Sequence, residues 1–271
     1  GYREDDLNWN IAGNTAGTNP NILSELTWED LQSLQLKMKG AGTAYEHLYV
    51  RTLCAAGWIL DGENQDSDYL SDNRAGEFSR SNNASDDGWT LDGSLGLGLQ
   101  FRFLSDTLQV APLGGYSIHW QRLTMTEGSQ TLGGTLGPIH GLDSTYNAEW
   151  LGPWAGVDAT YQPAPTFSLY GTLEYHWADY EAEANWNLRT DLAHPKSFEH
   201  IADGTGIVAS AGLRYALTDR LSLHASADFQ DWSTDPGIDR AFLANGTTSE
   251  TRLNEVNWNS IALMTSLSYQ W

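Results

Sequence analysis

Two aspartates that lie two residues apart, Asp66 and Asp68, are the strongest candidates for chemistry in this chain of 271 residues. If the apolar segment that ends at Trp58 continues as a strand, both carboxylates point to one face, and two adjacent carboxyl groups do not easily both ionise. Such a pair can position and deprotonate a water molecule, or it can hold Ca²⁺ through its oxygens. The alternative is a solvated acidic loop without chemistry. The whole acidic group is Asp61, Glu63, Asp66, Asp68 and Asp72.

The segments around these aspartates alternate between apolar and small or polar residues, a period of two that indicates β-strands. Residues 257–271 have this pattern and end in Trp271, an aromatic residue at the level where a membrane-spanning strand would meet the interface. One apolar and one polar face suit a strand between lipid and a polar lumen, so we predict a transmembrane β-barrel. A soluble β-sandwich would not explain the terminal Trp271. In residues 89–103 the apolar face consists of Trp89, Leu91, Leu95, Leu97, Leu99, Phe101 and Phe103.

The pattern predicts ten strands in a closed antiparallel barrel, because an even number lets the barrel close without a free edge. Short turns at one end and long polar segments at the other are typical of outer-membrane barrels, and we expect the strands to project beyond the membrane on the long-loop side. We predict that residues 1–271 form a single domain. The expected strands are 5–14, 23–40, 46–61, 87–103, 107–126, 142–162, 166–188, 205–217, 221–235 and 252–271. The expected long polar segments are 62–86, 127–141, 189–204 and 236–250.

Ionisable residues on the predicted inner rows form a second group of candidates. Glu174 and His176 lie two residues apart on one face and could act as an acid and a base. In a narrow barrel, side chains fill the interior, and opposite charges there would pair, since an unpaired buried charge is costly. We therefore favour a packing network over a catalytic pair. The inner rows carry Arg51, Arg102, Asp158, Glu174, His176, Arg214, His224 and Asp228.

Composition agrees with a barrel and limits the partners. No segment approaches the ~20 apolar residues of a membrane helix, whereas 12 Trp, 12 Tyr and 27 Gly suit aromatic girdles and tight turns. The single cysteine, Cys54, excludes an internal disulfide. No signal peptide is visible at Gly1, which suggests a processed mature chain. The net charge of −21 argues against nucleic acid as a partner, and favours cationic peptides or metal ions.

Four short motifs resemble those of the omptins, ten-stranded outer-membrane proteases of Gram-negative bacteria. Leu53-Cys-Ala-Ala-Gly-Trp58, followed by Gln65-Asp-Ser-Asp-Tyr69, is similar to a strand and loop of that family. Ser24-Glu-Leu-Thr-Trp28 resembles the family's second strand, and Gly171-Thr-Leu-Glu-Tyr175 resembles its seventh. The resemblance follows strand order over nearly the whole chain and implies a location in the bacterial outer membrane.

The resemblance also implies a site. In omptins two aspartates on one side of an extracellular cleft face an Asp-x-His pair on the other, and a water between them attacks the peptide bond. Asp66 and Asp68 match the aspartate pair. The opposite pair falls on Asn185 and Asn187 in an ungapped alignment. With a gap of one residue it falls on Ala184 and Trp186.

Neither alignment supplies a histidine, and a neutral amide such as Asn187 cannot act as a general base at pH 7. His194 and His200 follow in the next segment, and either could in principle fold back. Glu183 falls where the family keeps an acid that attracts basic side chains, and we predict that it contributes to substrate binding. The aspartate expected in the second-strand motif is replaced by Thr27, which puts the preference for basic residues in doubt.

Omptins also need lipopolysaccharide, which basic residues on the outside of the barrel hold. This chain has 14 Lys and Arg against 35 Asp and Glu, so we expect a weaker interaction, or one bridged by divalent cations. We predict no resident metal or cofactor, apart from this lipid requirement and Ca²⁺ at the acidic loops. Outer-membrane lipid and cationic peptides are the expected partners.

Three functions remain open. The first is an omptin-like barrel that has lost the catalytic Asp/His half and acts as a binding or structural surface protein. The second is an active endopeptidase that uses Asp66 and Asp68 with a relocated histidine. The third is a narrow channel for small solutes, which a lumen filled by charged side chains disfavours. The missing histidine favours the first function, and the retained aspartates favour the second.

Overall fold

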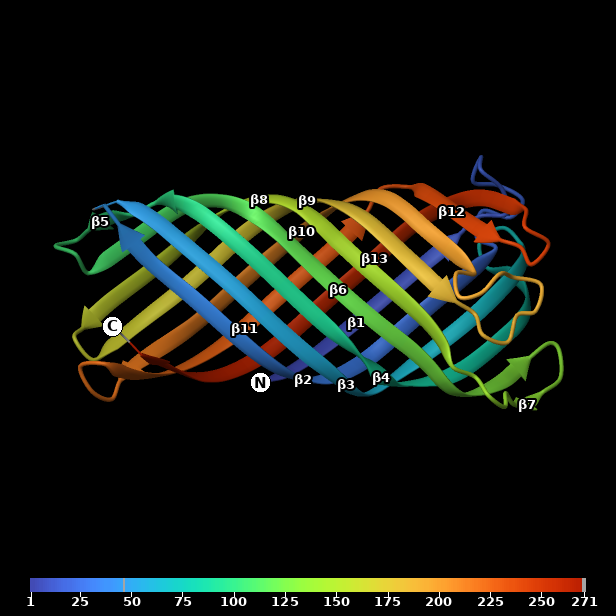
Figure 1. Cartoon of the computed structure of the whole chain (residues 1–271), viewed down its shortest axis with the longest axis horizontal. Coiled ribbons are helices and arrows are strands. Elements are labelled where there is room, and N and C mark those ends of the chain that lie inside the picture. The colour runs from blue at the N-terminus through green and yellow to red at the C-terminus, as the bar shows by residue number, and fades with distance from the viewer. Residues whose placement is uncertain (46, 270–271) are drawn as a thin grey trace.

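The computed structural model describes residues 1–45 and 47–269, and all of its strands belong to one antiparallel sheet that closes into a barrel (Figure 1). Strand β1 pairs with β2 on one side and with β13 on the other, which closes the ring. Among the described residues there is no helix long and apolar enough to cross a membrane. The fold is therefore the predicted ten-stranded barrel, and Trp271, its expected terminal anchor, lies outside the described residues.

Ten strands form the wall, with β5 continuing β4 and two short strands, β7 and β12, at the long-loop end. In chain order the elements are β1 (Tyr2–Ile11), β2 (Ser24–Ala44), β3 (Leu48–Ser71), β4 (Ala75–Leu99), β5 (Phe101–Phe103), β6 (Leu108–Leu132), β7 (Gly137–Pro138), β8 (Ser144–Ala164), β9 (Phe167–Asn185), β10 (Phe198–Ala216), β11 (Leu221–Thr234), β12 (Gly237–Phe242) and β13 (Thr248–Tyr269).

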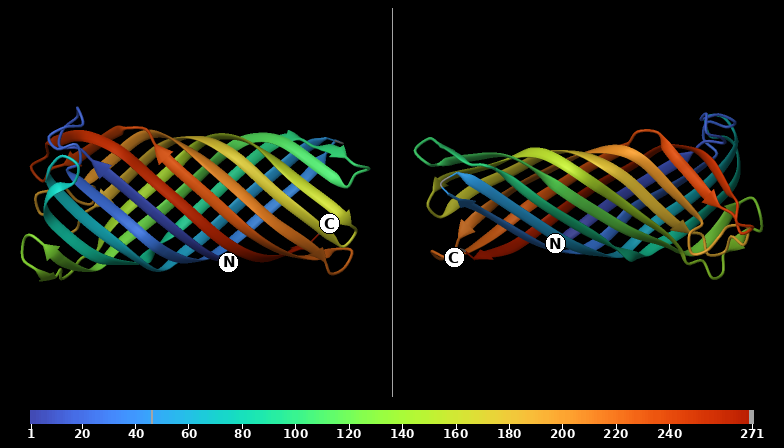
Figure 2. Two further views of the ribbon diagram at one scale, coloured as in Figure 1. Left: turned by 180° about the vertical axis from the view of Figure 1, so that it is seen from behind. Right: turned by 45° about the horizontal axis from the view of Figure 1, so that its top comes forward.

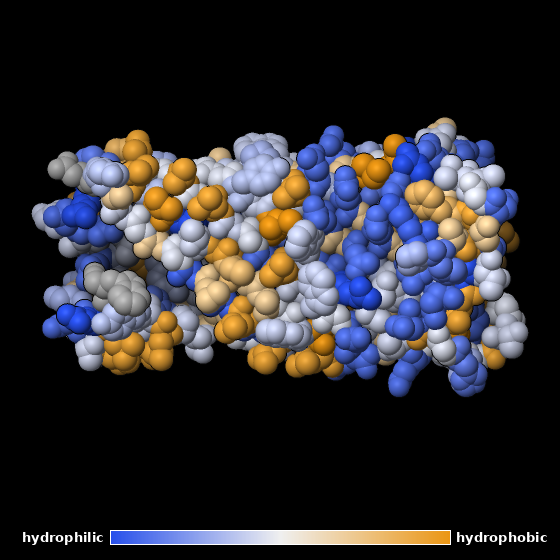
Figure 3. Space-filling model, viewed as in Figure 1, coloured by the Kyte–Doolittle hydropathy of each residue, from blue (hydrophilic) through white to orange (hydrophobic). Residues whose placement is uncertain are grey.

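The predicted alternation of faces is confirmed. In β4 the side chains of Leu95 and Leu97 are more than half exposed, whereas those of Thr90 and Asp92 point inward and are buried. Exposed apolar side chains gather around the half of the barrel that carries the short turns, and polar side chains cover the other half (Figure 3). An apolar outer band beside a polar lumen is the surface that a membrane barrel requires. The projecting half is thus the one that carries the long loops (Figure 2).

The predicted polar segment 62–86 is not a loop. Strands β3 and β4 continue through it, and only the turn 72–74 joins them. Asn73 and Arg74 both have a φ of 59°, the left-handed conformation of a tight hairpin turn. The other predicted polar segments are also partly strand: β6 runs on to Leu132, β10 begins at Phe198, and β12 and the start of β13 occupy much of 236–250. Apolar alternation fails there because neither strand face meets lipid.

Two apolar clusters close the interior. The larger one, called here the aromatic plug, fills the lumen of the projecting half, where Trp150, Trp232 and Trp258 pack with ring centroids 5.5–6.3 Å apart. A smaller cluster of Tyr49, Ala111, Leu113 and Trp154 lies nearer the short-turn end. Polar side chains occupy the lumen between them. The large rings of the plug are Trp9, Trp28, Tyr146, Trp150, Tyr180, Phe198, Trp232 and Trp258.

Candidate functional site

Asp66 and Asp68 lie in the projecting part of β3. The antiparallel register places Ser24 of β2 and Ser79 of β4 directly beside Asp68. Both serine hydroxyls hydrogen-bond the Asp68 carboxylate. The strand, which the sequence pattern broke at Asp61, thus continues far enough to put both carboxyl groups on one face.

The environment of the pair raises both pKa values. Burial raises the pKa of Asp66 to about 7, and the neighbouring Asp68 charge adds to this effect. Burial also raises the pKa of Asp68, against the hydrogen bonds from Ser24 and Ser79. Two neighbouring carboxyl groups whose pKa values are both raised titrate as a coupled pair. The Asp66 carboxyl group can therefore hold a proton at neutral pH, and a chemical role for the pair stays a prediction.

The opposite wall of the barrel mouth is formed by the end of β9 and the connection that follows it. Along β9 the inward side chains Ala178, Tyr180, Ala182 and Ala184 are buried. Trp186 continues this inward row, and its indole lies close enough to the Asp66 carboxylate to donate a hydrogen bond. Of the two alignments, the one that places Ala184 and Trp186 opposite the aspartates therefore matches the geometry.

Arg189, four residues after the end of β9, brings a positive charge to the aspartates. Its guanidinium interacts electrostatically with both Asp66 and Asp68 and pairs with Asp191 at 2.8 Å. Neighbouring contacts fix the connection: the ring of Trp186 packs against Phe198 at 4.7 Å, and Leu192 forms a bridge to the segment after β12. An indole and a guanidinium thus occupy the side where a base would be needed.

The amides of Asn185 and Asn187 have structural partners. Asn187 accepts from the Asp143 backbone and the Ser144 hydroxyl, each at 3.0 Å, and donates to the Gly141 carbonyl at 2.7 Å. Asn185 lies 2.8 Å from Nδ1 of His194. Both amides therefore hold neighbouring loops in place.

The two histidines that follow β9 lie apart from Asp66. His194 is exposed, and its Nε2 lies 3.2 Å from the Arg189 carbonyl. His200 is fully buried in the aromatic plug, where its Nδ1 lies 2.9 Å from the Tyr146 hydroxyl. The ring of Phe198 packs against both His200 and Trp186. The geometry therefore gives no support to a relocated histidine base.

Glu183 points away from the lumen. It lies between the buried Ala182 and Ala184, its side chain is 60% exposed, and it pairs with Lys196 at 2.5 Å. Lys196 also pairs with Glu199 at 2.5 Å. A role of Glu183 in substrate binding stays a prediction, and the geometry does not favour it because the carboxylate does not face the aspartate pair.

The predicted lumen residues Arg51, Asp158 and Glu174 form one buried ion network below the plug. Arg51 bridges Asp158 at 2.6 Å and Glu174 at 2.7 Å. His176 lies 3.1 Å from Glu174 through Nε2 and 3.0 Å from the Ser117 hydroxyl through Nδ1. The second nitrogen of His176 is thus also engaged, so the Glu174 and His176 pair belongs to a packing network, as favoured from the sequence.

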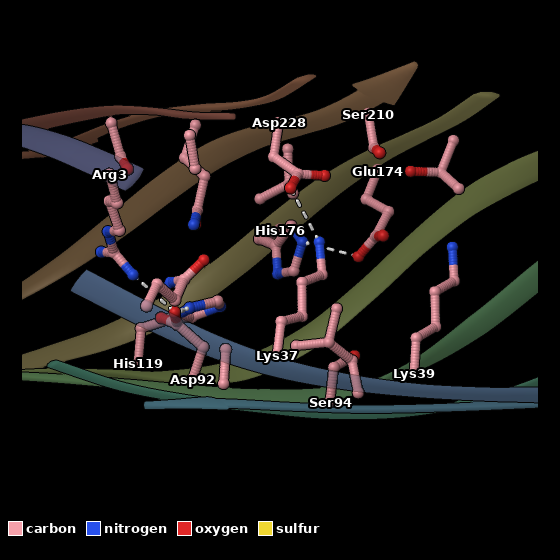
Figure 4. A pocket seen from close by; sticks show the side chains of 18 of the residues that line it. Arg3, Lys37, Lys39, Asp92, Ser94, His119, Glu174, His176, Ser210 and Asp228 are labelled. Carbon is pink, nitrogen blue, oxygen red and sulfur yellow. Dashed lines mark hydrogen bonds and ion pairs between the residues drawn. The ribbon is translucent and has the colours of Figure 1, made fainter. Parts of the chain in front are cut away.

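A second network was not predicted, because Arg3 lies outside the strand expected at residues 5–14. Arg3 binds Asp5 at 2.8 Å and Asp92 at 2.6 Å, and His119 lies 2.8 Å from the other oxygen of Asp92. The two networks line a cavity of about 60 Å³, in which Lys37 also pairs with Asp228 at 2.9 Å (Figure 4). The inward alternation of Arg3 and Asp5 was the signal that could have revealed this network.

The prediction of buried charge pairs fails for three other residues of the inner rows. Arg102 in β5 is exposed, because this short strand lies at the end of the wall. Arg214 donates to the Ser222 hydroxyl at 2.8 Å, and His224 bonds the Ser268 hydroxyl at 2.7 Å. Towards the short-turn end, hydroxyl groups therefore replace carboxylates as partners.

No group of three or more His, Cys, Asp or Glu side chains among the described residues is arranged to hold a metal ion. Ca²⁺ binding at the acidic loops stays a prediction. The aspartate pair can accept hydrogen bonds and hold a cationic group, but general-base hydrolysis also needs a group that takes a proton on the opposite side. Trp186 can only donate a hydrogen bond.

Comparisons with known proteins agree with the geometry of the wall. The sequence model of one family, described as "Pom: Protochlamydia outer membrane protein", matches residues 1–271. No curated protein matches the chain. The crystal structure of the outer membrane protease OmpT from Escherichia coli is similar in fold, with a TM-score of 0.80 over 100% of this chain and 94% of that chain. Its sequence identity is 13%, so this likeness concerns the fold alone.

Two other solved barrels match much less well. The COG4313 outer membrane channel from Pseudomonas putida F1 has a TM-score of 0.24 and 11% identity, over 97% of this chain and 94% of that chain. The in-vitro folded OmpT of Vibrio cholerae has a TM-score of 0.22 and 12% identity, over 100% of this chain and 97% of that chain. Neither score is high enough to carry an argument about shape.

Proposed function

The chain belongs to the Protochlamydia outer membrane protein family, and from this premise we propose that it is a non-catalytic surface barrel whose aspartate pair binds cationic groups. It is a β-barrel protein of the bacterial outer membrane with an omptin-like fold. The observation that carries the proposal is the contact of Trp186 with Asp66. The indole of Trp186 places a hydrogen-bond donor on the side of the site where peptide hydrolysis would require a general base.

The chemical class of the ligand can be inferred from Arg189, the cationic residue that already interacts with the aspartate pair. The guanidinium of Arg189 interacts with Asp66 and Asp68 and has only Asp191 as an ion-pair partner in the described part of the chain. A side chain of this type in another molecule would meet the same two carboxylates. The net charge of −21 would add long-range attraction for a cationic peptide. Arginine-containing peptides are therefore the proposed ligands.

The proposal is tested by the binding of a fluorescent arginine-rich peptide to the refolded barrel in lipopolysaccharide-containing vesicles. Arg189→Ala should tighten binding about threefold to tenfold, because the competing guanidinium is removed. The double variant Asp66→Asn, Asp68→Asn should weaken it by a similar factor or more. Asp235→Asn, which removes one exposed carboxylate elsewhere on the rim, is the matched control. Equal binding by all four proteins would contradict the proposal.

Lipopolysaccharide is the second proposed partner, held through divalent cations. Several cations of the projecting half are already engaged by acids: Arg74 by Glu25, Arg240 by Glu199, and Lys196 by Glu183. In the described part of the chain these three cations are thus already paired and less available to lipid phosphates. EDTA should accordingly weaken co-purification of lipopolysaccharide with the barrel, and unchanged co-purification would contradict this partner mode.

An active endopeptidase is the second candidate function, and the raised pKa of Asp66 is the observation that favours it. A carboxyl group with a pKa of about 7 can exchange a proton at neutral pH, as a dyad that activates water must do. This candidate would be favoured by peptide hydrolysis that disappears in the Asp66→Asn, Asp68→Asn variant. The channel alternative has less support, because the aromatic plug fills the lumen.

A further inference from the structure

Tyr146 of the aromatic plug begins a chain of polar side chains that is separate from the aspartate pair. Its hydroxyl lies 2.9 Å from Nδ1 of His200 and 2.6 Å from the hydroxyl of Tyr180. On the far side of the imidazole, Nε2 of His200 lies 3.2 Å from the Asp239 carboxylate. The four side chains come from β8, β9, β10 and β12, in the projecting half of the barrel. Two phenols, an imidazole and a carboxylate are thus joined in one line.

The positions of the hydrogens follow from the chemistry of these groups. The Asp239 carboxylate beside Nε2 favours the tautomer of His200 that carries its hydrogen on Nε2. Nδ1 then has a free lone pair, which accepts the hydrogen of the Tyr146 hydroxyl. Because that hydroxyl has only one hydrogen, the Tyr180 hydroxyl must donate to the Tyr146 oxygen. Tyr146 is therefore a phenol whose proton already points at a base.

A substrate molecule cannot contact this phenol. The side chains of Tyr146, Tyr180 and His200 are fully buried, and Asp239 is 5% exposed. Burial raises the pKa of Tyr146 well above its ordinary value, so the phenol keeps its proton at neutral pH. Acid–base or nucleophilic chemistry on a bound molecule is thus closed to it. An electron, however, can cross a packed interior, and a proton can move along a hydrogen bond.

Aromatic rings in contact connect Tyr146 with the mouth of the barrel. The ring centroid of Phe198 lies 6.5 Å from that of Tyr146 and 4.7 Å from that of Trp186. Trp186 is only partly buried, so an oxidant in solution can reach its indole. On the other side of Tyr146 the ring of Trp28 is stacked at 5.2 Å. Packed rings offer short tunnelling steps, and tryptophan and tyrosine are the aromatic side chains that one-electron oxidants attack.

We propose that Tyr146 is a redox-active tyrosine that gives one electron to a one-electron oxidant at the mouth of the barrel, such as a radical formed from peroxide. The electron passes through Phe198 and Trp186 to the oxidant, which is reduced by one electron. At the same time the O–H bond of Tyr146 breaks and an N–H bond forms at Nδ1 of His200. The products are a neutral phenoxyl radical and an imidazolium beside Asp239. One electron from a reductant such as a thiol, with return of the proton from Nδ1, restores the phenol.

The surroundings of Tyr146 favour this coupled transfer. Loss of an electron alone would leave a positively charged phenol in the plug, and an unpaired buried charge is costly. Transfer of the proton to His200 leaves Tyr146 neutral and places the positive charge beside the Asp239 carboxylate, which favours the charged form of the imidazole. The Tyr180 hydroxyl continues to donate to the radical oxygen. Because the ring is fully buried, the radical is also shielded from molecules that would quench it.

The test oxidises the refolded barrel with a ruthenium(III) tris-bipyridine complex, generated by light and persulfate. The positive charge of the complex draws it to this acidic protein. Electron paramagnetic resonance of samples frozen after illumination, with and without ring-deuterated tyrosine, should show a long-lived tyrosyl radical. Tyr146→Phe should lose this signal, and so should His200→Gln, because a neutral amide does not accept the proton. Tyr215→Phe, which removes an exposed tyrosine of the outer face, is the matched control and should keep the signal.

The gel mobility of each variant shows whether it has folded. An unchanged long-lived signal in folded Tyr146→Phe, or no such signal in the wild type, would overturn the proposal. A second measurement needs only the wild type: a soluble gadolinium complex shortens the spin relaxation time of radicals that solvent can approach. The signal should keep its relaxation time because Tyr146 is fully buried. A shortened relaxation time would place the radical on a surface tyrosine and would also rule out Tyr146.

Discussion

The indole of Trp186 interacts with the carboxyl group of Asp66 and lowers its pKa. The two residues come from opposite walls, Asp66 from β3 and Trp186 from the connection after β9. Their contact gives the carboxyl group a neutral donor and keeps a proton-accepting side chain out of the same position. The properties of this pair decide between a hydrolytic site and a binding site.

The pKa of Asp66 can be measured by NMR from the chemical shift of the Trp186 indole N–H. Because burial and Asp68 raise that pKa to about 7, the carboxyl group should be protonated at pH 5 and ionised at pH 9. The indole N–H resonance of Trp186 should therefore shift with a midpoint near pH 7 in a ¹⁵N-tryptophan-labelled barrel. Trp186→Phe assigns the resonance, and Asp66→Asn should remove the titration. A resonance that does not move between pH 5 and 9 would contradict the contact.

The same shift makes stability depend on pH. The folded-state pKa of Asp66 lies above the unfolded value of 3.8, so the folded state binds more protons between about pH 4 and 7. Stability is therefore lost as pH rises through this window. At pH 8, Asp66→Asn should stabilise the barrel by about 1–2 kcal/mol, less than the full shift implies, because water reaches the half-buried carboxyl group.

Urea unfolding in detergent, followed by the gel mobility of the folded barrel, measures this difference. At pH 4 the wild type and Asp66→Asn should unfold at the same urea concentration, since the wild-type carboxyl group is then neutral. Asp235→Asn, at an exposed position on the rim, is the control. Destabilisation by Asp66→Asn at pH 8 would show that the ionised carboxylate is well solvated or well paired.

Arg51, like Arg3, bridges two buried carboxylates of the lumen, and its removal should destabilise the barrel strongly. Arg51→Ala leaves Asp158 and Glu174 buried without their common cation, which should cost about 3–5 kcal/mol of stability. Arg102→Ala removes the same type of side chain from an exposed position and should change stability by less than about 0.5 kcal/mol. Equal effects of the two substitutions, measured by urea unfolding, would contradict the buried network.

Much of the wall could be predicted because its outer face meets lipid. A lipid-facing surface requires apolar side chains such as those of Leu95 and Leu97. Their alternation with small or polar residues predicted both the strand and which of its faces points outward. Above the membrane this requirement ends. Residues 62–86 are mostly polar on both faces and therefore have no apolar period, although hydrogen bonding between neighbouring strands continues through most of them.

The candidate site could be predicted only on one side. Asp66 and Asp68 lie on a continuation of the strand that contains Trp58, so it could be inferred that their side chains share one face. The opposite side depended on a shift of one residue, which exchanges Asn187 for Trp186 at the inward position. Arg189 belongs to a connection that is held by the packing of Trp186 on Phe198 and by the bridge from Leu192 to Leu243, a residue far along the chain. Local sequence patterns contain no signal for such contacts.

The aromatic plug should prevent permeation. Trp150, Trp232 and Trp258 are at most 1% exposed and pack against one another across the lumen. The wild-type barrel should therefore give no conductance steps in a planar bilayer at neutral pH. Trp58→Ala, on the lipid face, should behave in the same way. Discrete steps in the wild type, from a preparation shown to be folded, would favour the channel alternative.

Peptide hydrolysis tests the central claim most directly. The refolded barrel, supplied with lipopolysaccharide, is incubated with a mixed peptide library beside the Asp66→Asn, Asp68→Asn variant, and products are identified by mass spectrometry. A non-catalytic site predicts no products from either protein while the wild type still binds arginine-containing peptides. Products from the wild type that disappear in the double variant would contradict the claim and establish hydrolysis at the aspartate pair.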